Sequence, residues 1–215
     1  DGGGDFAEVL RHPSANAGDP TRREGFRALV FAPSTPSIAY AALAKDRGTI
    51  DAMPPAGGVF FRSANGGATF TSPTTDLDGL NVYRLLVDPA NANKVWAATS
   101  GGLYASTDGG SSWSALPAFA GKVISAAAVH PSNANAIAAA EKNVGIWVSV
   151  DGGASLDGVG PHNAGFTNPN PAVLALAFEP GGAGKLYAAD FYSGVYVSTD
   201  GGRSWSGFPD AGMNG

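Results

Sequence analysis

The chain has 215 residues, no cysteine and a net charge of −5. A chain of this length can form one all-β domain with a sizeable core. Because the 13 Lys and Arg residues form no basic stripe, a nucleic-acid partner is not expected. The lack of cysteine excludes disulfides, thiolate metal sites and a cysteine nucleophile, and no apolar run reaches the roughly 18 residues of a membrane helix. High Gly and Pro contents, 31 and 15 residues, favour short strands joined by tight turns.

An eight-residue unit recurs four times along the chain. Its third position is Asn or Asp, and successive third positions lie 43, 43 and 49 residues apart. The four copies are SANGGATF (Ser63–Phe70), STDGGSSW (Ser106–Trp113), SVDGGASL (Ser149–Leu156) and STDGGRSW (Ser198–Trp205). A period of 40 to 50 residues is typical of propeller blades.

Each copy closes a longer pattern in which four strands are expected. An apolar strand ends at a proline, two further short apolar strands follow, and the eight-residue unit leads into the fourth. The interval from that proline to the unit's third position is 19 or 20 residues in the last three repeats and 32 in the first, so the first repeat carries an insertion. The prolines are Pro33, Pro89, Pro131 and Pro180.

These repeats predict an all-β fold, a β-propeller segment of four four-stranded blades that belongs to a larger propeller. Asp1–Phe6 matches the second half of the eight-residue unit, so a preceding blade is expected. The expected organisation is the end of that blade plus a linker at 1–24, blades at 25–72, 82–116, 123–158 and 173–208, and the start of the next linker at 209–215.

The third position and the two glycines of the unit predict a tight hairpin turn. An Asp or Asn there accepts hydrogen bonds from backbone N–H groups of its own turn, and the glycines supply dihedral angles that other residues avoid. The aromatic residue at the end is expected to pack inward. Since each unit belongs to a different blade, a structural role is favoured over a shared catalytic or calcium site. The residues assigned this role are Asp1, Asn65, Asp108, Asp151, Asp200, Phe70, Trp113 and Trp205.

The pattern resembles the Asp-box, or bacterial neuraminidase repeat, family of β-propellers, and the resemblance runs from Asp1 to Trp205. It is similar above all to the repeats of sortilin-type receptors and of xyloglucanase-like bacterial proteins. The resemblance implies that the eight-residue units, called boxes below, lie on the face opposite the ligand site. Asn65 and Leu156 depart from the family pattern, and weaker turns are expected there.

Ligand-binding residues are therefore sought in the loops between second and third strands and in the linkers between blades. The long ones are Glu8–Glu24, Ala44–Gly57 and Gly158–Pro171, and loops of this length are usually functional or disordered. The candidate ligand-binding residues are Arg22, Arg23, Arg47, Phe191 and Tyr192. The alternatives are a solvated loop for the arginines and packing between blades for the two aromatic residues.

The leading functional interpretation is a non-catalytic propeller that binds or scaffolds a protein or glycan outside the cytoplasm, with a place in a larger assembly also compatible. The alternative is a glycoside hydrolase of the xyloglucanase-like type. Asp190 loosely matches one of that enzyme type's two aspartates, and Asp46 or Asp51 would be its partner, since an inverting pair needs carboxyl groups about 6.5–9.5 Å apart. A sialidase is disfavoured because its F/Y-R-I-P motif is missing.

No cofactor or metal is expected. The three histidines, His12, His130 and His162, are too scattered for a metal site. His130 stands where the other repeats have Asp88 and Glu179, which predicts a turn residue.

Overall fold

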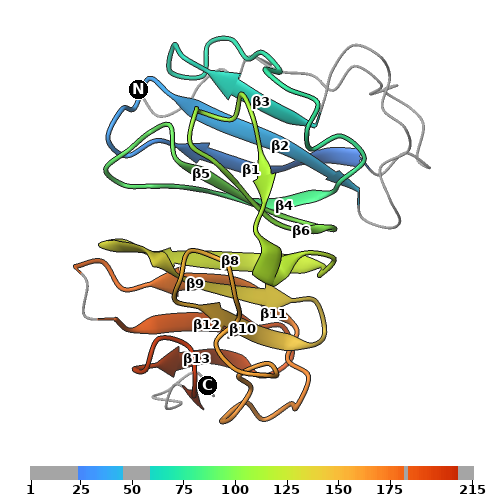
Figure 1. The fold of residues 1–215 in the computed structure, drawn as a ribbon, viewed down its shortest axis with the longest axis vertical. Coiled ribbons are helices and arrows are strands. Elements are labelled where there is room, and N and C mark those ends of the chain that lie inside the picture. Colours follow the sequence, from blue (N-terminus) through green and yellow to red (C-terminus); the bar gives the residue numbers. More distant parts are fainter. Residues whose placement is uncertain (1–23, 46–58, 182–183, 208–215) are drawn as a thin grey trace, which may run out of the picture. The chain divides into compact units, whose positions relative to one another are not determined.

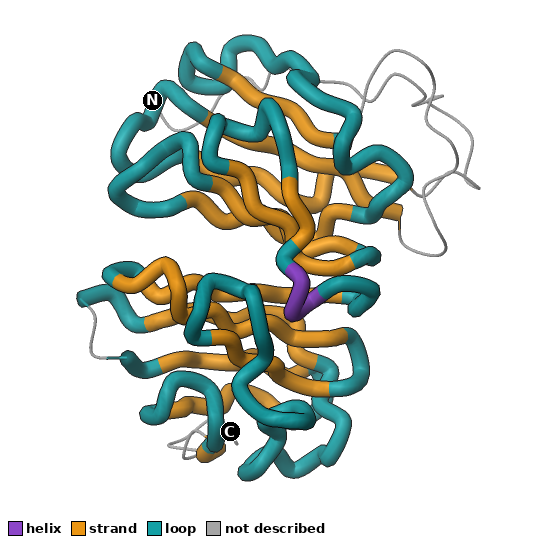
Figure 2. Tube along the Cα trace, viewed as in Figure 1, coloured by secondary structure: helices purple, strands orange, loops and turns teal. Residues whose placement is uncertain are grey.

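The computed structural model describes residues 24–45, 59–181 and 184–207, and within these ranges the chain is almost entirely β-structure. Four antiparallel sheets follow one another, with strand orders β1-β2-β3, β4-β5-β6-β7, β10-β9-β8 and β11-β12-β13-β14 (Figure 1). Strands that pair are also consecutive in sequence, so each sheet is a meander. The helix among the described residues is one 3₁₀ turn, η1 at Pro117–Phe119 (Figure 2). The predicted all-β class is confirmed.

The strands are short, as the Gly and Pro content predicts. The first two sheets comprise β1 (Glu24–Phe31), β2 (Ala39–Lys45) and β3 (Phe60–Ser63), then β4 (Val82–Val87), β5 (Val95–Thr99), β6 (Gly102–Ser106) and β7 (Ser114–Ala115). The last two comprise β8 (Ile124–His130), β9 (Asn133–Glu141) and β10 (Gly145–Ser149), then β11 (Val173–Phe178), β12 (Leu186–Asp190), β13 (Gly194–Ser198) and β14 (Ser206–Gly207).

The described residues form two compact units. One contains the residues up to Val95 together with Ser106–Trp113, and the other contains Trp96–Ala105 and the residues from Ser114 onward. Each unit has its own core, and the boundary runs through the second sheet.

In the first unit the core is built from aromatic side chains. Tyr40 and Phe60 are fully buried and their ring centroids lie 5.6 Å apart, while Phe60 meets the ring of Trp113 edge-on at 5.0 Å. The Tyr40 hydroxyl donates a hydrogen bond to the Ala92 carbonyl at 2.8 Å, which satisfies its buried polar end. The first and second repeats are thereby joined.

In the second unit the third and fourth sheets pack face to face. The third sheet contributes mainly alanines, among them Ala126 and Ala140, and the fourth contributes larger side chains such as Leu186, Tyr196 and Trp205. Small side chains on one sheet let the large ones of the next approach closely, and both sets are buried.

A β-bulge occurs at the same place in the first, third and fourth sheets. One residue of the first strand is left out of the pairing with the second, between Phe26 and Ala28, between Ile124 and Ala126, and between Val173 and Ala175. Bulges increase the local twist of a strand. The sequence pattern contains no residue type common to the three bulges, so they were not predicted.

The prediction of four strands in every repeat is wrong for the first and third. In the second sheet, the Leu116 N–H donates to the Leu103 carbonyl at 2.9 Å and extends the pairing of β7. Pro73 holds the place of Leu116 in the first repeat and has no N–H, so only a single bridge between Arg62 and Thr71 forms. In the third repeat, Gly158 turns the chain away with a φ of 97° directly after Asp157.

Candidate functional site

Several candidate residues lie outside the described residues. These are Asp1, Arg22, Arg23, Asp46, Arg47 and Asp51. The proposed carboxylate pairs of Asp190 with Asp46 or Asp51 therefore remain predictions, as does the mixed-charge patch of the arginines. The remaining candidates are Asp190, Phe191 and Tyr192, at the turn between β12 and β13.

Asp190 is the last residue of β12, and its carboxylate caps this turn. Its Oδ2 accepts hydrogen bonds from the backbone N–H groups of Tyr192 at 3.2 Å and Ser193 at 2.9 Å, and from the Ser193 hydroxyl at 2.5 Å. The residue is 6% exposed, and its Oδ1 is buried without a hydrogen-bond partner among the described residues. The carboxylate is thus held by the backbone of its own turn.

The two aromatic residues that follow Asp190 point outward. Phe191 is 65% exposed and Tyr192 is 74% exposed. Their ring centroids lie 4.9 Å apart with the planes at 90°, an edge-to-face pair. The Phe191 N–H donates to the Ala172 carbonyl at 3.0 Å, which ties the base of the pair to the residue before β11. The turn therefore presents an aromatic surface on a fixed backbone.

The loop from Gly158 to Pro171 is anchored to the sheets. The Asn163 side chain accepts from the Ile146 N–H at 3.1 Å and donates to the Val144 carbonyl at 2.8 Å. Phe166 is buried against Tyr196, with ring centroids 4.3 Å apart. This loop was expected to belong to the ligand face, which stays a prediction, and its Phe166 side chain completes the core.

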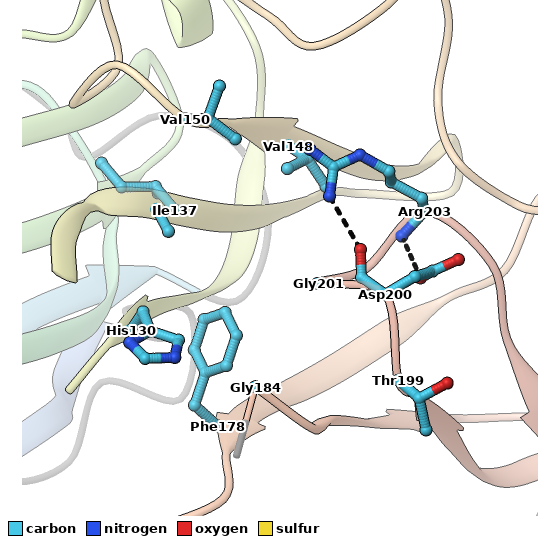
Figure 3. A pocket seen from close by; sticks show the side chains of 11 residues that line it. His130, Ile137, Val148, Val150, Phe178, Gly184, Thr199, Asp200, Gly201 and Arg203 are labelled. Atoms are coloured by element: carbon cyan, nitrogen blue, oxygen red, sulfur yellow. Dashed lines mark hydrogen bonds between the residues drawn. The ribbon is translucent and has the colours of Figure 1, made fainter. Parts of the chain in front are cut away.

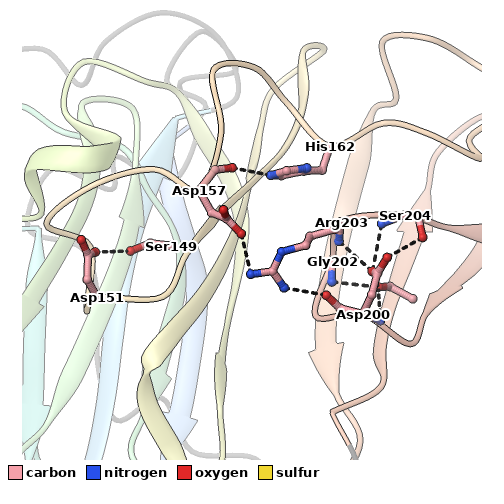
Figure 4. Close-up of polar contacts among 9 residues, drawn as sticks. Ser149, Asp151, Asp157, His162, Asp200, Gly202, Arg203 and Ser204 are labelled. Carbon is pink, nitrogen blue, oxygen red and sulfur yellow. Dashed lines mark hydrogen bonds and ion pairs between the residues drawn. The ribbon is translucent and has the colours of Figure 1, made fainter.

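The box turns have the hydrogen bonds that the pattern predicts. At Asp200, Oδ1 accepts from the Ser198 hydroxyl at 2.7 Å and from the Arg203 and Ser204 N–H groups at 2.9 Å, and Oδ2 accepts from the Ser204 hydroxyl (Figure 4). Burial favours a higher pKa for Asp200, but the hydrogen bonds from Ser204 and Ser198 outweigh it and hold the pKa well below its usual range.

The same arrangement recurs at Asp108 and Asp151. The hydroxyl and N–H of Ser112 lower the pKa of Asp108 to about 2, and Ser155 lowers the pKa of Asp151 in the same way. The second box glycine is required by packing, because a Cβ at Gly110 would lie 2.2 Å from the Phe60 ring. These carboxylates are ionised and saturated with donors, which suits a structural role and not proton transfer.

A cavity of about 190 Å³ lies between the third and fourth sheets near the last box (Figure 3). Ile137, Val148 and Phe178 form its apolar wall, and the His130 ring meets Phe178 edge-on at 5.1 Å. At the rim, the Arg203 guanidinium pairs with Asp157 at 2.5 Å and donates to the Asp200 carbonyl. The cavity has room for a small apolar side chain. It was not predicted, since its residues come from two repeats.

His130 also has the turn role predicted for it. Its Nδ1 lies 3.3 Å from the Ser132 N–H, as the Asp88 carboxylate accepts from the Ala90 N–H at 2.8 Å in the second repeat. Among the described residues no three His, Asp or Glu side chains lie close enough to hold a metal ion. Within the same ranges, no helix is long and apolar enough to cross a membrane.

Comparison with known proteins defines the class as a β-propeller. An ancestral GH74 enzyme superposes with a TM-score of 0.65 at 26% identity, covering 90% of this chain and 25% of that one. The GH74 xyloglucanase from Xanthomonas campestris gives 0.57 at 21% identity, covering 89% of this chain and 31% of that one. YCF48 bound to D1 peptide gives 0.52 at 14% identity, covering 86% of this chain and 52% of that one.

The chain thus spans between a quarter and about half of the length of these propellers. No family model matches the sequence, and no curated protein matches it. The four antiparallel sheets and the structural matches establish the fold as that of a β-propeller.

Proposed function

We propose that the chain is a non-catalytic β-propeller module that binds or scaffolds a protein or glycan partner outside the cytoplasm. The observation that carries this proposal is the state of Asp190, the candidate catalytic carboxylate that the structure describes. The extracytoplasmic location rests on the resemblance of the repeats to those of the Asp-box family.

A general acid or base must reach the proton that it transfers. Asp190 is 6% exposed, and all the hydrogen bonds that its carboxylate accepts in the described residues come from Tyr192 and Ser193 of its own turn. Removing the carboxylate from these contacts would leave two backbone N–H groups without an acceptor. Turn capping accounts for every hydrogen bond of its Oδ2 without any catalytic role.

Phe191 and Tyr192 are the binding residues in this proposal. An exposed aromatic pair on a fixed turn can stack on the apolar face of a sugar or against an extended peptide, at a low cost in side-chain entropy. YCF48, which shares the propeller fold, has been solved bound to D1 peptide, which supports a peptide partner.

Binding can be measured by calorimetry with xyloglucan oligosaccharides and by selection from a displayed peptide library. The double variant Phe191→Ala, Tyr192→Ala is expected to weaken binding at least tenfold, because aromatic anchors dominate such contacts. Val159→Ala is the matched control, since Val159 is fully exposed on a loop. Unchanged affinity in the double variant would remove Phe191 and Tyr192 from the site.

A glycoside hydrolase of the xyloglucanase type is the second candidate. It is favoured by the 26% identity to an ancestral GH74 enzyme over 90% of this chain. The test is release of reducing ends from xyloglucan, with Asp190→Asn as the variant that keeps the shape of the turn. Turnover by the native chain that Asp190→Asn abolishes would replace the binding proposal with hydrolysis.

A further inference from the structure

The first box differs chemically from the other three. It holds Asn65 followed by Gly66, whereas the others hold Asp followed by Gly. An Asn–Gly pair can deamidate without an enzyme: the Gly66 nitrogen attacks Cγ of Asn65, ammonia leaves, and a succinimide ring joins the two residues. Glycine hinders this attack least, because it has no Cβ. Both residues are exposed, and no atom lies within 4 Å of the place that a Cβ on Gly66 would take.

The exposure of Asn65 is a property of the box. Asp108 and Asp151 hold the same position in the second and third repeats, each of which has a described repeat before and after it, and both are exposed as well. Asn65 also lines a cavity of about 190 Å³ together with Arg62 and Thr69, which has room for water. Water can therefore reach the side chain that reacts.

The hydrogen bonds of the box activate this amide. The Asn65 Oδ1 accepts from the Ser63 hydroxyl at 2.9 Å and from the Thr69 N–H at 2.9 Å. When the Gly66 nitrogen attacks, negative charge builds on Oδ1, and two fixed donors stabilise it as an oxyanion hole does. The proton of the Gly66 nitrogen passes to water. The departing Nδ2, 2.8 Å from the Thr69 hydroxyl, takes a proton from that hydroxyl, which regains one from water.

The same two donors decide how water opens the ring. Attack on Cγ breaks its bond to the Gly66 nitrogen and yields Asp. Attack on the backbone carbonyl carbon of residue 65 breaks the original peptide bond and yields isoaspartate. Because Ser63 and Thr69 donate to the oxygen on Cγ, that carbon is the more reactive of the two, and Asp is the expected product.

We infer that Asn65 is a self-converting site, at which the first box changes its own Asn into the Asp of the other three boxes. The reaction consumes one water and releases one ammonia. The product suits the turn: the Asp108 Oδ2 accepts from the Ser112 hydroxyl at 2.6 Å, and such a charge-assisted hydrogen bond is stronger than a neutral one. The Ser112 hydrogen bonds hold the pKa of Asp108 at about 2. A box carboxylate therefore stays ionised and resists further attack, so the reaction ends at Asp.

The test follows the tryptic peptide Ser63–Arg84 by mass spectrometry while the folded chain is kept in mildly alkaline buffer, beside a sample unfolded in urea. Electron-transfer fragmentation locates the change at residue 65 and distinguishes Asp from isoaspartate. The ratio of Asp to isoaspartate should be about tenfold higher in the folded chain, because the two donors are in place only there. Equal ratios, or a folded chain that keeps its amide while the unfolded chain loses it, would overturn the inference.

Two variants test the donors separately. Ser63→Ala removes the hydroxyl that donates to Oδ1, so it should lower both the rate and the ratio of Asp to isoaspartate about tenfold. Thr69→Val keeps the N–H donor but removes the hydroxyl beside Nδ2, so it should slow the conversion and leave that ratio unchanged. Ser198→Ala makes the matched change in the fourth box and should leave residue 65 as in the native chain.

A native rate and a native ratio in folded Ser63→Ala would contradict the inference. Ser63 is buried and also accepts from the Gly67 N–H, so circular dichroism must show that this variant folds. Thr69 is exposed, and its variant should fold as the native chain does. If Ser63→Ala is unfolded, Thr69→Val decides alone, and a native rate there would reject the inference.

Discussion

The four repeats share one turn but differ in the segment after that turn. In all four, a box serine and the Asn or Asp two residues later organise the turn through the same hydrogen bonds. The second and fourth repeats then add a short fourth strand, whereas the first and third stop at the first step of pairing. The turn is thus independent of the strand, and the residues just beyond the box decide whether the strand forms.

The largest expected effect is a difference in stability between substitutions at the last residues of two boxes, Trp205 and Leu156. Trp205 is 4% exposed, packs against Phe166 with ring centroids 5.3 Å apart, and donates from Nε1 to the His162 carbonyl. Trp205→Ala should lower the free energy of unfolding by about 3–5 kcal/mol, whereas Leu156→Ala in the third repeat should cost less than about 2 kcal/mol. Denaturant titration measures both, and equal losses would contradict the distinction.

A smaller effect is a difference in acid response between a box with a charged third position, Asp108, and the first box, where that position is Asn65. The folded pKa of Asp108 is lowered to about 2 from an ordinary value of 3.8, so its contribution to stability is fully present above pH 3.8 and is lost as the pH falls through 2. Asn65 cannot titrate, so its turn should not respond. The Ser112 and Thr69 amides, which donate to Asp108 and Asn65, report this by NMR. A similar acid shift at Thr69 would show that the response is not local.

The smallest effect concerns the missing strand of the first repeat. Pro73→Ala supplies the N–H that Leu116 uses in the second repeat, so hydrogen exchange should show new protection of that amide. The change in stability should stay below about 1 kcal/mol, because the new hydrogen bond is offset by the greater freedom of the unfolded chain. Ser72→Ala adds no donor and serves as control. An unprotected amide at residue 73 would assign the lost strand to another cause.

The sequence predicted the all-β class, the four repeats and the box hydrogen bonds, because each depends on residue type at a fixed spacing. It did not predict where the fourth strand fails. Pro73 and Gly158 act through one N–H and one dihedral angle, which stand outside the repeated pattern.

Prediction of the candidate site was less complete. Asp190 and the exposed pair Phe191 and Tyr192 could be singled out by type and position, but the capping role of Asp190 depends on backbone geometry that no side-chain pattern records. The cavity beside His130 and Arg203 escaped prediction because it forms only when residues about 70 positions apart meet.

The first strands of the first, third and fourth sheets each have a bulge near their start, and this bulge bears on how the repeats diverge. The extra residue is Arg27, Ser125 and Leu174 in the three sheets, three unrelated chemistries at one structural place. A position whose backbone is fixed but whose side chain is outside the ladder can change without disturbing the pairing. At Ser125 the hydroxyl donates to the Val173 carbonyl of the next sheet at 2.9 Å. Substitutions at this site can therefore change the contact between neighbouring sheets without disturbing the strand pairing within a sheet.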